Sequence, residues 1–276
     1  MGPDRVGKVP GPTALPAHGV EIACRDDGDG PAVLLLHETG GSALVWDRLH
    51  EELAGAARVI SYDRRGWGDT GAPEGYARTT VEEHAEDAVA VLDALGVEDA
   101  VVAGAGVGGV AALDLALRRP GLVRAGVLVE PPLLALLPQA TEGMSADRET
   151  IEGAVRDGGP EAALDAYLAG ALPFLGPGAG RIPDEAAAPA RRRPLSLFAE
   201  LAAVPSWALQ GRALSTAEVP ILIVTGASTP PLLREAGAAL AARLPESRSL
   251  TVGGSGLPHI DAAPELAAEL RSLLAA

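Results

Sequence analysis

A strand, a turn crowded with glycine and a helix follow one another between residues 101 and 113. Small residues on both sides of the turn are typical of a nucleophile elbow, in which a central reactive residue is held in a strained turn above a sheet. The central residue here is Gly106, which has no side chain. The pattern therefore predicts the local structure clearly and the chemistry poorly.

The same glycines fit a second kind of site. The pattern Gly104-x-Gly106-x-x-Gly109 between a strand and a helix is a dinucleotide-binding fingerprint, because such glycines let a pyrophosphate approach a helix N-terminus. Glu130 ends the next strand and could hold a ribose, although it follows Gly104 by 26 residues instead of the roughly 20 expected. An FAD- or NAD-binding Rossmann protein is therefore one alternative.

Composition limits the partners. The 276 residues are 47% hydrophobic and carry a formal net charge of −15. A chain of this length can form one large α/β domain with an insertion, or two small domains. Its negative charge repels phosphate backbones and anionic membranes, so we expect a small-molecule ligand or substrate and neither nucleic acid nor a membrane as partner. A homodimer is left open.

Cysteine usage and apolar runs restrict the class further. Cys24 is the only cysteine, which excludes an internal disulfide, and without a cluster of cysteine and histidine we expect no metal and no cofactor. The first residues lack an apolar run behind their charges, so no signal peptide is visible. The longest apolar run, at 100–113, is too short to span a bilayer. We therefore expect a cytoplasmic protein.

The elements that must position these residues alternate regularly. Continuous apolar runs predict buried strands, and apolar residues at helical spacing, with a capping box at Thr80 and Glu83, predict the helices between them. The predicted strands are 20–24, 33–37, 58–63, 100–103, 125–130, 220–224 and 249–252, and the predicted helices include 43–54, 81–95, 232–244 and 262–274. Such alternation favours a parallel sheet with right-handed crossovers.

The alternation stops between residues 131 and 218. Only helical patterns occur there, together with most of the few aromatic residues of the chain. We interpret this segment as a helical cap inserted between two strands, and residues 1–130 and 219–276 as the core domain. The run Arg191-Arg192-Arg193 is interpreted as a solvated face of the cap.

Three loops follow predicted strands in a recognisable order. They are His37-Glu38-Thr39-Gly40-Gly41-Ser42, Asp63-Arg64-Arg65-Gly66-Trp67-Gly68 and Gly104-Ala105-Gly106-Val107-Gly108-Gly109. With these loops at these intervals, the chain resembles an α/β-hydrolase with a helical cap over nearly its whole length. The resemblance implies an α/β-hydrolase fold, with a mostly parallel, doubly wound sheet and an inserted helical cap.

The resemblance also locates the three catalytic positions of the family. Its nucleophile, acid and histidine would fall at Gly106, Thr229 and Leu257, so none of the three is a residue that could serve in that role. Acyl transfer by a serine that a histidine activates is therefore not expected.

The backbone donors around the turn do not depend on these side chains. By resemblance, the N–H groups of Thr39 and Val107 point at a common spot, where an oxygen of a ligand could be held. Together with His37, Gly106 and Trp207 they are the expected ligand-binding residues of a mainly apolar pocket between cap and sheet.

We expect any chemistry from Glu38, Glu130 and His259. Glu38 replaces a glycine of the family's oxyanion loop, where a partly dry pocket would raise its pKa and suit it to acid–base work; alternatively it turns outward or pairs with Arg64 or Arg65. Glu130 lies where some members, including haloalkane dehalogenases, supply their acid, and it could instead be a polar strand end. His259 lies two residues past the family's histidine position and could reach Glu130, or it could be an ordinary surface histidine.

The remaining histidines are expected to have no role in chemistry. His50 and His84 fall on helices with charged neighbours, and His18 falls in a loose segment, so all three are expected on the surface.

Two hypotheses of function follow. The first is an enzyme that acts on a small hydrophobic oxygen-bearing molecule without a serine nucleophile, by hydrolysis without an acyl-enzyme, or by a lyase, isomerase or cyclisation step. The second is a ligand-binding pseudo-hydrolase without catalysis, because fold alone does not fix function.

Overall fold

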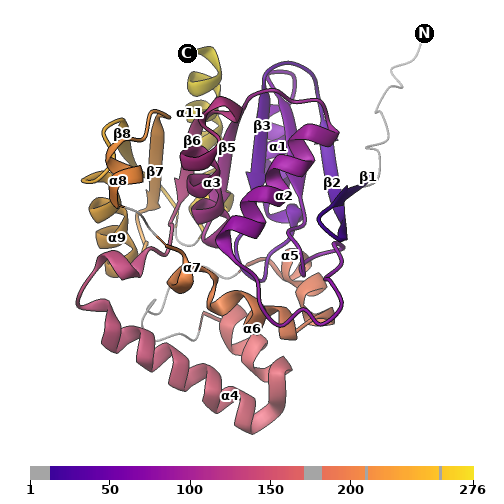
Figure 1. Cartoon of the computed structure of the whole chain (residues 1–276), viewed down its shortest axis with the longest axis vertical. Coiled ribbons are helices and arrows are strands. Elements are labelled where there is room, and N and C mark those ends of the chain that lie inside the picture. Colours follow the sequence, from indigo (N-terminus) through magenta and orange to yellow (C-terminus); the bar gives the residue numbers. More distant parts are fainter. Residues whose placement is uncertain (1–12, 171–181, 209–210, 255–256) are drawn as a thin grey trace.

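A mostly parallel sheet of eight strands forms the centre of the computed structural model, which describes residues 13–170, 182–208, 211–254 and 257–276. The strands lie in the order β1-β2-β4-β3-β5-β6-β7-β8 (Figure 1). β1 and β2 run antiparallel to each other, β2 runs antiparallel to β4, and all other neighbours are parallel. The strands are β1 (Thr13–Ala17), β2 (Val20–Asp27), β3 (Ala32–Leu36), β4 (Arg58–Tyr62), β5 (Ala100–Ala105), β6 (Val123–Val129), β7 (Ile221–Gly226) and β8 (Ser247–Val252). The predicted parallel α/β sheet is confirmed.

Helices cover both faces of the sheet because the strands bury both sets of their side chains. In β3, Leu34 and Leu36 join the hydrophobic cluster of α2, α3 and α9, whereas Val33 and Leu35 join the cluster of α1 and α11. These helices are α1 (Asp47–Leu53), α2 (Val81–Ala94), α3 (Val107–Arg118), α9 (Pro231–Ala241) and α11 (Ala263–Ala275). Two shorter elements accompany them, the 3-10 helix Ala43–Trp46 before α1 and α10 (Pro258–Asp261) before α11.

The predicted capping box at the start of α2 is present. The Thr80 hydroxyl accepts a hydrogen bond from the Glu83 N–H, and the Glu83 carboxylate accepts one from the Thr80 N–H, each at 3.1 Å. These bonds satisfy two of the N–H groups that a helix start leaves without partners. The cap stabilises the helix by about 1 kcal/mol.

The sequence interpretation missed β1. The first predicted strand is 20–24, but Thr13–Ala17, before it, forms an antiparallel edge strand against β2. Pro16 lies inside this strand, which an edge position allows because one side of an edge strand needs no hydrogen-bond donor. Proline and glycine around the strand hid the signal.

Between β6 and β7 the described residues form helices and no strand, and we call residues 131–218 the helical excursion. It contains the 3-10 helix Leu134–Leu136, α4 (Ala140–Leu168), α5 (Asp184–Ala187), the 3-10 helix Ala188–Arg192, α6 (Leu195–Leu201), α7 (Ala203–Ser206) and α8 (Gly211–Ser215). In α4 the helical geometry is broken at Gly158 and Gly159, just before Pro160. Figure 1 shows α4 beyond the end of the sheet that lies opposite the C-terminus.

The arginine run of the excursion is not simply a solvated face. Arg192 and Arg193 both donate hydrogen bonds to the carbonyl oxygen of Gly68, at 3.0 and 3.1 Å. Arg191 forms an ion pair with Asp165 at 3.0 Å. The run therefore ties the excursion to the loop after β4, which the sequence interpretation did not foresee.

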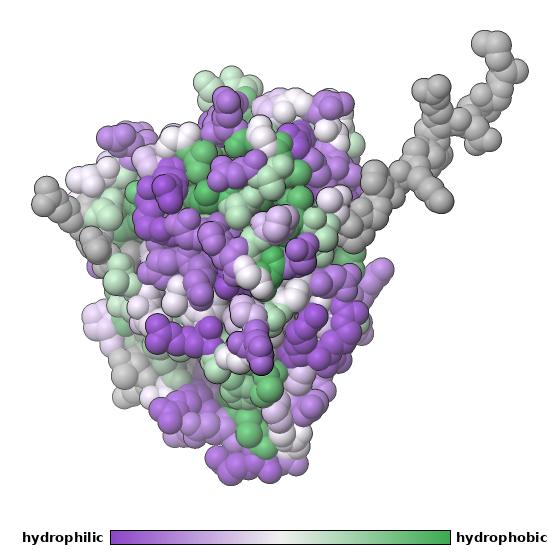
Figure 2. Space-filling model, turned by 45° about the vertical axis from the view of Figure 1, so that its right-hand side comes forward, coloured by the Kyte–Doolittle hydropathy of each residue, from purple (hydrophilic) through white to green (hydrophobic). Residues whose placement is uncertain are grey.

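The surface is largely polar. Figure 2 shows a mostly hydrophilic face on which hydrophobic residues gather in smaller areas. The exposed large hydrophobic side chains of the described residues are Leu44, Met144, Val155, Leu195 and Leu201. No helix among the described residues is long and apolar enough to cross a membrane.

We expect Gly104→Ala to destabilise the protein by about 3 kcal/mol, because overpacking of a core typically costs 1–3 kcal/mol and the obstacle here is backbone. A Cβ at residue 104 would stand 2.2 Å from the carbonyl oxygen of Gly108, in the first turn of α3. Gly121→Ala is the matched control, since a Cβ there would meet no atom within 4 Å. Urea unfolding of both variants checks the prediction, and equal midpoints would contradict it.

Candidate functional site

A cavity lies where the carboxyl ends of the parallel strands meet the helical excursion. Loops after β3, β5, β6 and β7, the loop leading into α10, and the end of α4 contribute to its wall. Ligand sites of parallel sheets commonly occupy this edge, because the loops after adjacent strands converge there. Its lining residues are Glu38, Thr39, Ala105, Gly106, Val107, Val129, Glu130, Pro132, Tyr167, Leu168, Gly170, Ile182, Pro230, Leu233, Leu257 and His259.

The cavity is small and mainly apolar. Its volume is about 140 Å³. An engineered cavity of about 150 Å³ holds benzene, which sets the scale of a ligand that would fill the space. Two carboxylates and one imidazole are its ionisable acid and base groups besides Tyr167, and no lysine or arginine is among the described residues that line it.

Glu38 and His259 form a buried pair in this cavity. The Nε2 atom of His259 lies 3.2 Å from the Oε2 atom of Glu38, and the two residues are 1% and 8% exposed. The contact is an ion pair without aligned hydrogen-bond geometry, and the oxygens of Glu38 and the ring nitrogens of His259 have no hydrogen-bond partner among the described residues. Buried polar atoms normally have such partners, so this pair retains capacity to bind a ligand or water.

The ring of His259 is held in place by packing. His259 follows Pro258 in α10, and its ring lies 4.8 Å from the Trp46 ring, centre to centre, at an angle of 50°. Tilted ring pairs at this separation attract each other and restrict rotation. The His259 ring therefore contacts Glu38 from within the buried core.

The structure corrects the expected pKa of Glu38. Burial raises the pKa of its carboxyl group, as the sequence suggested, but the interaction with the His259 ring lowers the pKa by more than burial raises it. The resulting pKa lies below the ordinary value of 4.5. The sequence interpretation had the burial right and lacked the partner, so it gave the wrong direction. Neither Arg64 nor Arg65 is the ion-pair partner of Glu38.

Glu130 lies close by in a different environment. Its φ of 47° is in the left-handed region that a side chain rarely adopts, and its Oε1 accepts a hydrogen bond from the hydroxyl of Thr229. Burial raises the pKa of Glu130, against the opposing hydrogen bond from Thr229 and the charge of His259. His259 thus forms its ion pair with Glu38 and is buried, whereas the sequence left open a contact with Glu130 or a place on the surface.

Glu38 fills the space beside Gly106. Its φ of 54° and ψ of −124° give the strained turn that the glycine pattern predicted. A Cβ added at residue 106 would stand 3.0 Å from the Cβ of Glu38, which is tighter than most real Cβ contacts. A side chain at residue 106 would therefore require Glu38 to shift by a few tenths of an ångström, so the two positions are coupled.

The glycines of the dinucleotide pattern are also explained by contacts within the chain. A Cβ at Gly104 would strike the backbone of Gly108, and a Cβ at Gly109 would stand 2.9 Å from the carbonyl oxygen of Gly104. Close packing of α3 on β5 therefore requires these glycines. The acid of that pattern, Glu130, is hydrogen-bonded to Thr229.

Thr39 and Val107 line the cavity as expected, and His37 does not. The Nδ1–H of His37 donates to the carbonyl oxygen of Glu38 at 2.7 Å, and its Nε2 accepts from the N–H of Arg64 at 2.9 Å. Burial and the charge of Arg64 lower the pKa of His37 to about 3, so the ring is neutral. His37 braces the loop from behind, and its expected contact with a ligand is wrong for this cavity.

Trp207 also lies outside the cavity lining. Its indole N–H donates to Asp114 on α3 at 2.9 Å, and its ring packs against the core cluster of α2 and α3. The excursion instead reaches the cavity through Tyr167, Leu168 and Ile182. The sequence predicted an aromatic residue of the excursion in the cavity wall, and among the described residues that aromatic is Tyr167 and not Trp207.

Two histidines expected on the surface are buried. His84 has no exposed surface and lies in a charged cluster around Arg64, and His50 is 4% exposed. The Nε2 of His50 lies 2.9 Å from the Ser61 hydroxyl, and its Nδ1 lies 3.0 Å from Asp27. This chain of serine, histidine and aspartate has the order of a catalytic triad. Ser61 is completely buried within β4 and does not line the cavity, so the chain has no access to a substrate there.

No group of three or more metal-ligating side chains occurs among the described residues.

Comparison with known proteins places these features in a family. The sequence profile described as "Alpha/beta hydrolase family" matches residues 33–269. A protein assigned as the carbamate hydrolase RutD of Azorhizobium caulinodans is 40% identical over 115 residues, which are 41% of this chain and 43% of that protein. The chain thus aligns with less than half the length of this curated relative.

Solved structures resemble almost the whole chain. An N-acyl homoserine lactone degrading enzyme has a TM-score of 0.73 and 24% identity, covering 94% of this chain and 99% of that one. The enol-lactonase from Burkholderia xenovorans has a TM-score of 0.71 and 21% identity, covering 94% and 98%. At these identities the likeness shows the shared fold.

The mutual dependence of residues 38 and 106 predicts a coupling in stability. We expect Gly106→Ala to cost about 1 kcal/mol less in a Glu38→Gly background than in the wild type, because residues in contact show coupling energies of 0.5–3 kcal/mol. The strain of a side chain at positive φ is present in both backgrounds and cancels. Urea unfolding of the four proteins of this cycle provides the measurement, and additive effects would contradict the contact.

Electrostatics predict that the pKa of Glu38 shifts in the opposite direction when His259 is replaced. In the wild type its carboxyl group should titrate below 4.5, and in His259→Gln it should titrate above that value, because burial then acts without its largest opponent. Carboxyl ¹³C resonances over a pH series measure both pKa values.

The contribution of Glu38 to the free energy of unfolding should depend on pH in opposite directions in the wild type and in His259→Gln. A lowered folded pKa gives the wild type a contribution that is present above 4.5 and is lost as the pH falls through the lowered pKa. A raised folded pKa in His259→Gln gives a contribution that is lost as the pH rises through it. The same pH dependence in both proteins would exclude His259 as the group that controls Glu38.

Proposed function

The chain belongs to the alpha/beta hydrolase family, and we propose that it hydrolyses a small, mostly apolar, neutral molecule through Glu38 and His259 instead of a serine nucleophile. The buried pair of these two residues, 3.2 Å apart in the cavity above Gly106, carries the proposal. The Cβ of Glu38 is the nearest atom to the place where a side chain at residue 106 would begin.

The described residues that line this cavity include no serine. Gly106 has no side chain, and Thr229 uses its hydroxyl to accept from the Gly226 N–H and to donate to Glu130. Leu257, at the family's histidine position, contributes an apolar wall. Direct attack by water therefore replaces the acyl-enzyme in our proposal.

Water attacks a carbonyl carbon of the substrate in the proposed reaction. Its proton passes to the pair of Glu38 and His259 as the new C–O bond forms, and the carbonyl oxygen becomes an oxyanion. The backbone N–H groups of Thr39 and Val107 hold that oxyanion. When the intermediate collapses, the bond to the leaving oxygen or nitrogen breaks, and the leaving group takes the proton from the pair.

Glu130 has a supporting role in this proposal. Its raised pKa favours the neutral form, while the lowered pKa of Glu38 favours the carboxylate. Two carboxyl groups in one cavity with opposite shifts commonly divide the work of acid and base. Glu130 tunes the charge around His259, and Glu38 is the ionised partner.

The cavity suggests the kind of substrate. The described lining residues include two acidic side chains and no lysine or arginine, which disfavours an anion, and the apolar walls favour a neutral compound. The relatives and structural neighbours named as a carbamate hydrolase and as lactone-degrading enzymes indicate neutral carboxyl derivatives. We propose an ester, a lactone or a carbamate whose enclosed part is about as large as a benzene ring.

We further propose that the helical excursion, residues 131–218, serves as a cap. Tyr167, Leu168 and Ile182 face the cavity from the excursion, opposite the loops after the strands. A wall of this kind excludes bulk water from the reacting groups, which strengthens their electrostatic interactions.

We expect Glu38→Gln to lower kcat by at least about 100-fold with little change in binding, because general acid–base catalysis contributes 10²- to 10⁴-fold and the amide keeps the shape of the side chain. Turnover of 4-nitrophenyl acetate, γ-caprolactone and phenyl carbamate measures the effect. Glu51→Gln, on the exposed side of α1, is the matched control and should not change kcat. A serine-directed reagent such as phenylmethylsulfonyl fluoride should not inhibit.

Two results would contradict the proposal. Unchanged turnover in Glu38→Gln would remove the role of this residue. Binding of these probes to the wild type without any turnover would favour the ligand-binding pseudo-hydrolase instead.

A further inference from the structure

A buried ionic cluster joins the helical excursion to the loop after β4. Its centre is Glu200 on α6, whose carboxylate forms an ion pair with Arg64 and accepts a hydrogen bond from the Trp67 indole N–H at 3.0 Å. The Nε2 of His84 lies 2.9 Å from the same carboxylate. All four side chains are at most 2% exposed. Because Arg64 is completely buried, its charge needs Glu200 as a counterion.

Arg64 extends from this cluster to the loop that carries Glu38. Its Nε donates to the carbonyl oxygen of His37 at 2.7 Å, and its backbone N–H donates to the Nε2 of the same residue at 2.9 Å. His37 in turn donates to the carbonyl oxygen of Glu38 at 2.7 Å. An unbroken series of hydrogen bonds therefore runs from Glu200 to the backbone of Glu38.

We propose that Glu200 is a positioning residue for Glu38: through Arg64 and His37 it fixes the loop so that the Glu38 carboxylate meets His259. The catalytic consequence rests on the proposed function, whereas the contact between Glu38 and His259 does not. The inference assigns a role in the site to a residue that lies in the excursion, outside the lining of the cavity.

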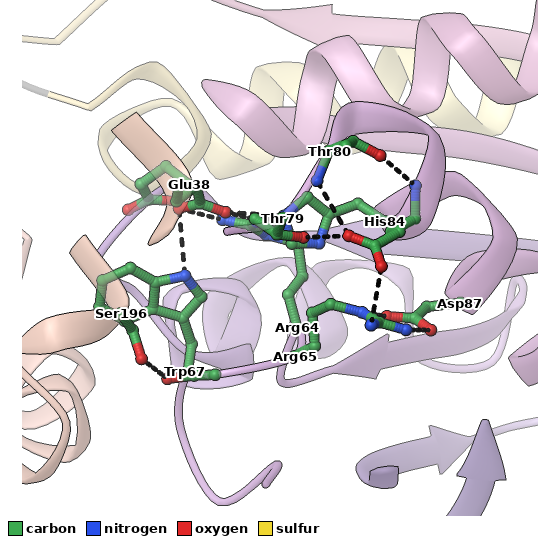
Figure 3. A network of polar contacts seen from close by, with 12 residues as sticks. Glu38, Arg64, Arg65, Trp67, Thr79, Thr80, His84, Asp87 and Ser196 are labelled. Atoms are coloured by element: carbon green, nitrogen blue, oxygen red, sulfur yellow. Dashed lines mark hydrogen bonds and ion pairs between the residues drawn. The ribbon is translucent and has the colours of Figure 1, made fainter. Parts of the chain in front are cut away.

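Directional geometry distinguishes this cluster from an ordinary structural ion pair. Arg65, the neighbour of Arg64, forms two hydrogen bonds of 2.6 Å with Asp87 on α2, and this pair is equally buried (Figure 3). None of the side-chain contacts of Arg65 reaches His37 or Glu38. The two pairs therefore offer similar burial and charge, and only one of them leads to the site.

Charge balance gives a second reason why Glu200 matters. The charge of Arg64 acts on the ring of His37, which must stay neutral to accept from one neighbour and donate to the other. Glu200 acts on the same ring with the opposite sign. The Glu200 carboxylate therefore holds the Arg64 guanidinium in place and offsets its charge at the His37 ring.

Comparison of Glu200→Gln with Asp87→Asn tests the inference. Each variant replaces one carboxylate of a buried arginine pair by an amide of the same shape, so both should unfold at lower urea concentrations. Only Glu200→Gln should lower kcat, by about 10- to 100-fold, with KM changed less than about threefold, which is the usual effect of losing a residue behind a reacting group. Asp87→Asn should keep kcat within about twofold of the wild type.

The ring ¹⁵N resonances of His259 give a readout without turnover. Glu38→Gln removes the direct partner and sets the size and direction of the change. Glu200→Gln should move the His259 resonances in that direction, and Asp87→Asn should leave them in place. If Glu200→Gln does not fold, Trp67→Phe, which removes one donor to the same carboxylate, takes its place and should cause a smaller change of the same sign.

The outcomes separate this inference from the proposed function. Movement of the His259 resonances in Glu200→Gln supports the positioning role even if the wild type turns over none of the probes. Unmoved resonances in a folded Glu200→Gln overturn it, whatever the activity. Equal effects of Glu200→Gln and Asp87→Asn on kcat and on the resonances would also overturn it, because they would reduce Glu200 to a general contribution to stability.

Discussion

The space above the turn after β5 is shared by two segments of the chain, and the site depends on how they share it. Gly106 stands in the left-handed conformation of a nucleophile elbow, and a side chain there would approach the Cβ of Glu38 to 3.0 Å. Side chains on both segments would therefore require one of them to shift by a few tenths of an ångström. With glycine in the turn, Glu38 needs no such shift and contacts His259. The absence of a side chain at residue 106 and the position of the Glu38 carboxylate are thus coupled through packing.

Placing a carboxylate in an apolar cavity is costly, and the surrounding structure offsets that cost. His259 supplies an opposite partner on one side, and the neutral His37 fixes the backbone on the other. Arg64 and Glu200 lie behind His37. They compensate each other's charge, because both are buried away from solvent. Removing one member of such a pair is far more destabilising than the pair is stabilising, about 3–5 kcal/mol, because the other charge is left buried alone. The loop is thus held from the side that faces away from the cavity.

The sequence predicted much of this arrangement because parallel strands are continuous apolar runs and their loops meet at one edge. The family resemblance pointed to Glu38, Glu130 and His259, and all three line the same cavity. It failed where the outcome depends on a distant partner. Glu200 is 136 residues from Arg64 in the sequence, and it is buried although glutamate side chains are mostly exposed. The pKa of Glu38 shows the same limit, since burial can be inferred from a motif, whereas the opposing charge of His259 is seen only in the fold.

The two carboxyl groups of the cavity end in unequal states for reasons that can be traced atom by atom. Thr229 accepts from the Gly226 N–H, so its own proton points to the Oε1 of Glu130, which stays an acceptor in either protonation state. The other oxygen of Glu130 can then carry a proton where burial favours it. Glu38 has the histidine at its side and keeps its charge. The same cavity therefore holds one carboxyl group whose pKa is lowered by its histidine partner and one whose pKa is raised by burial.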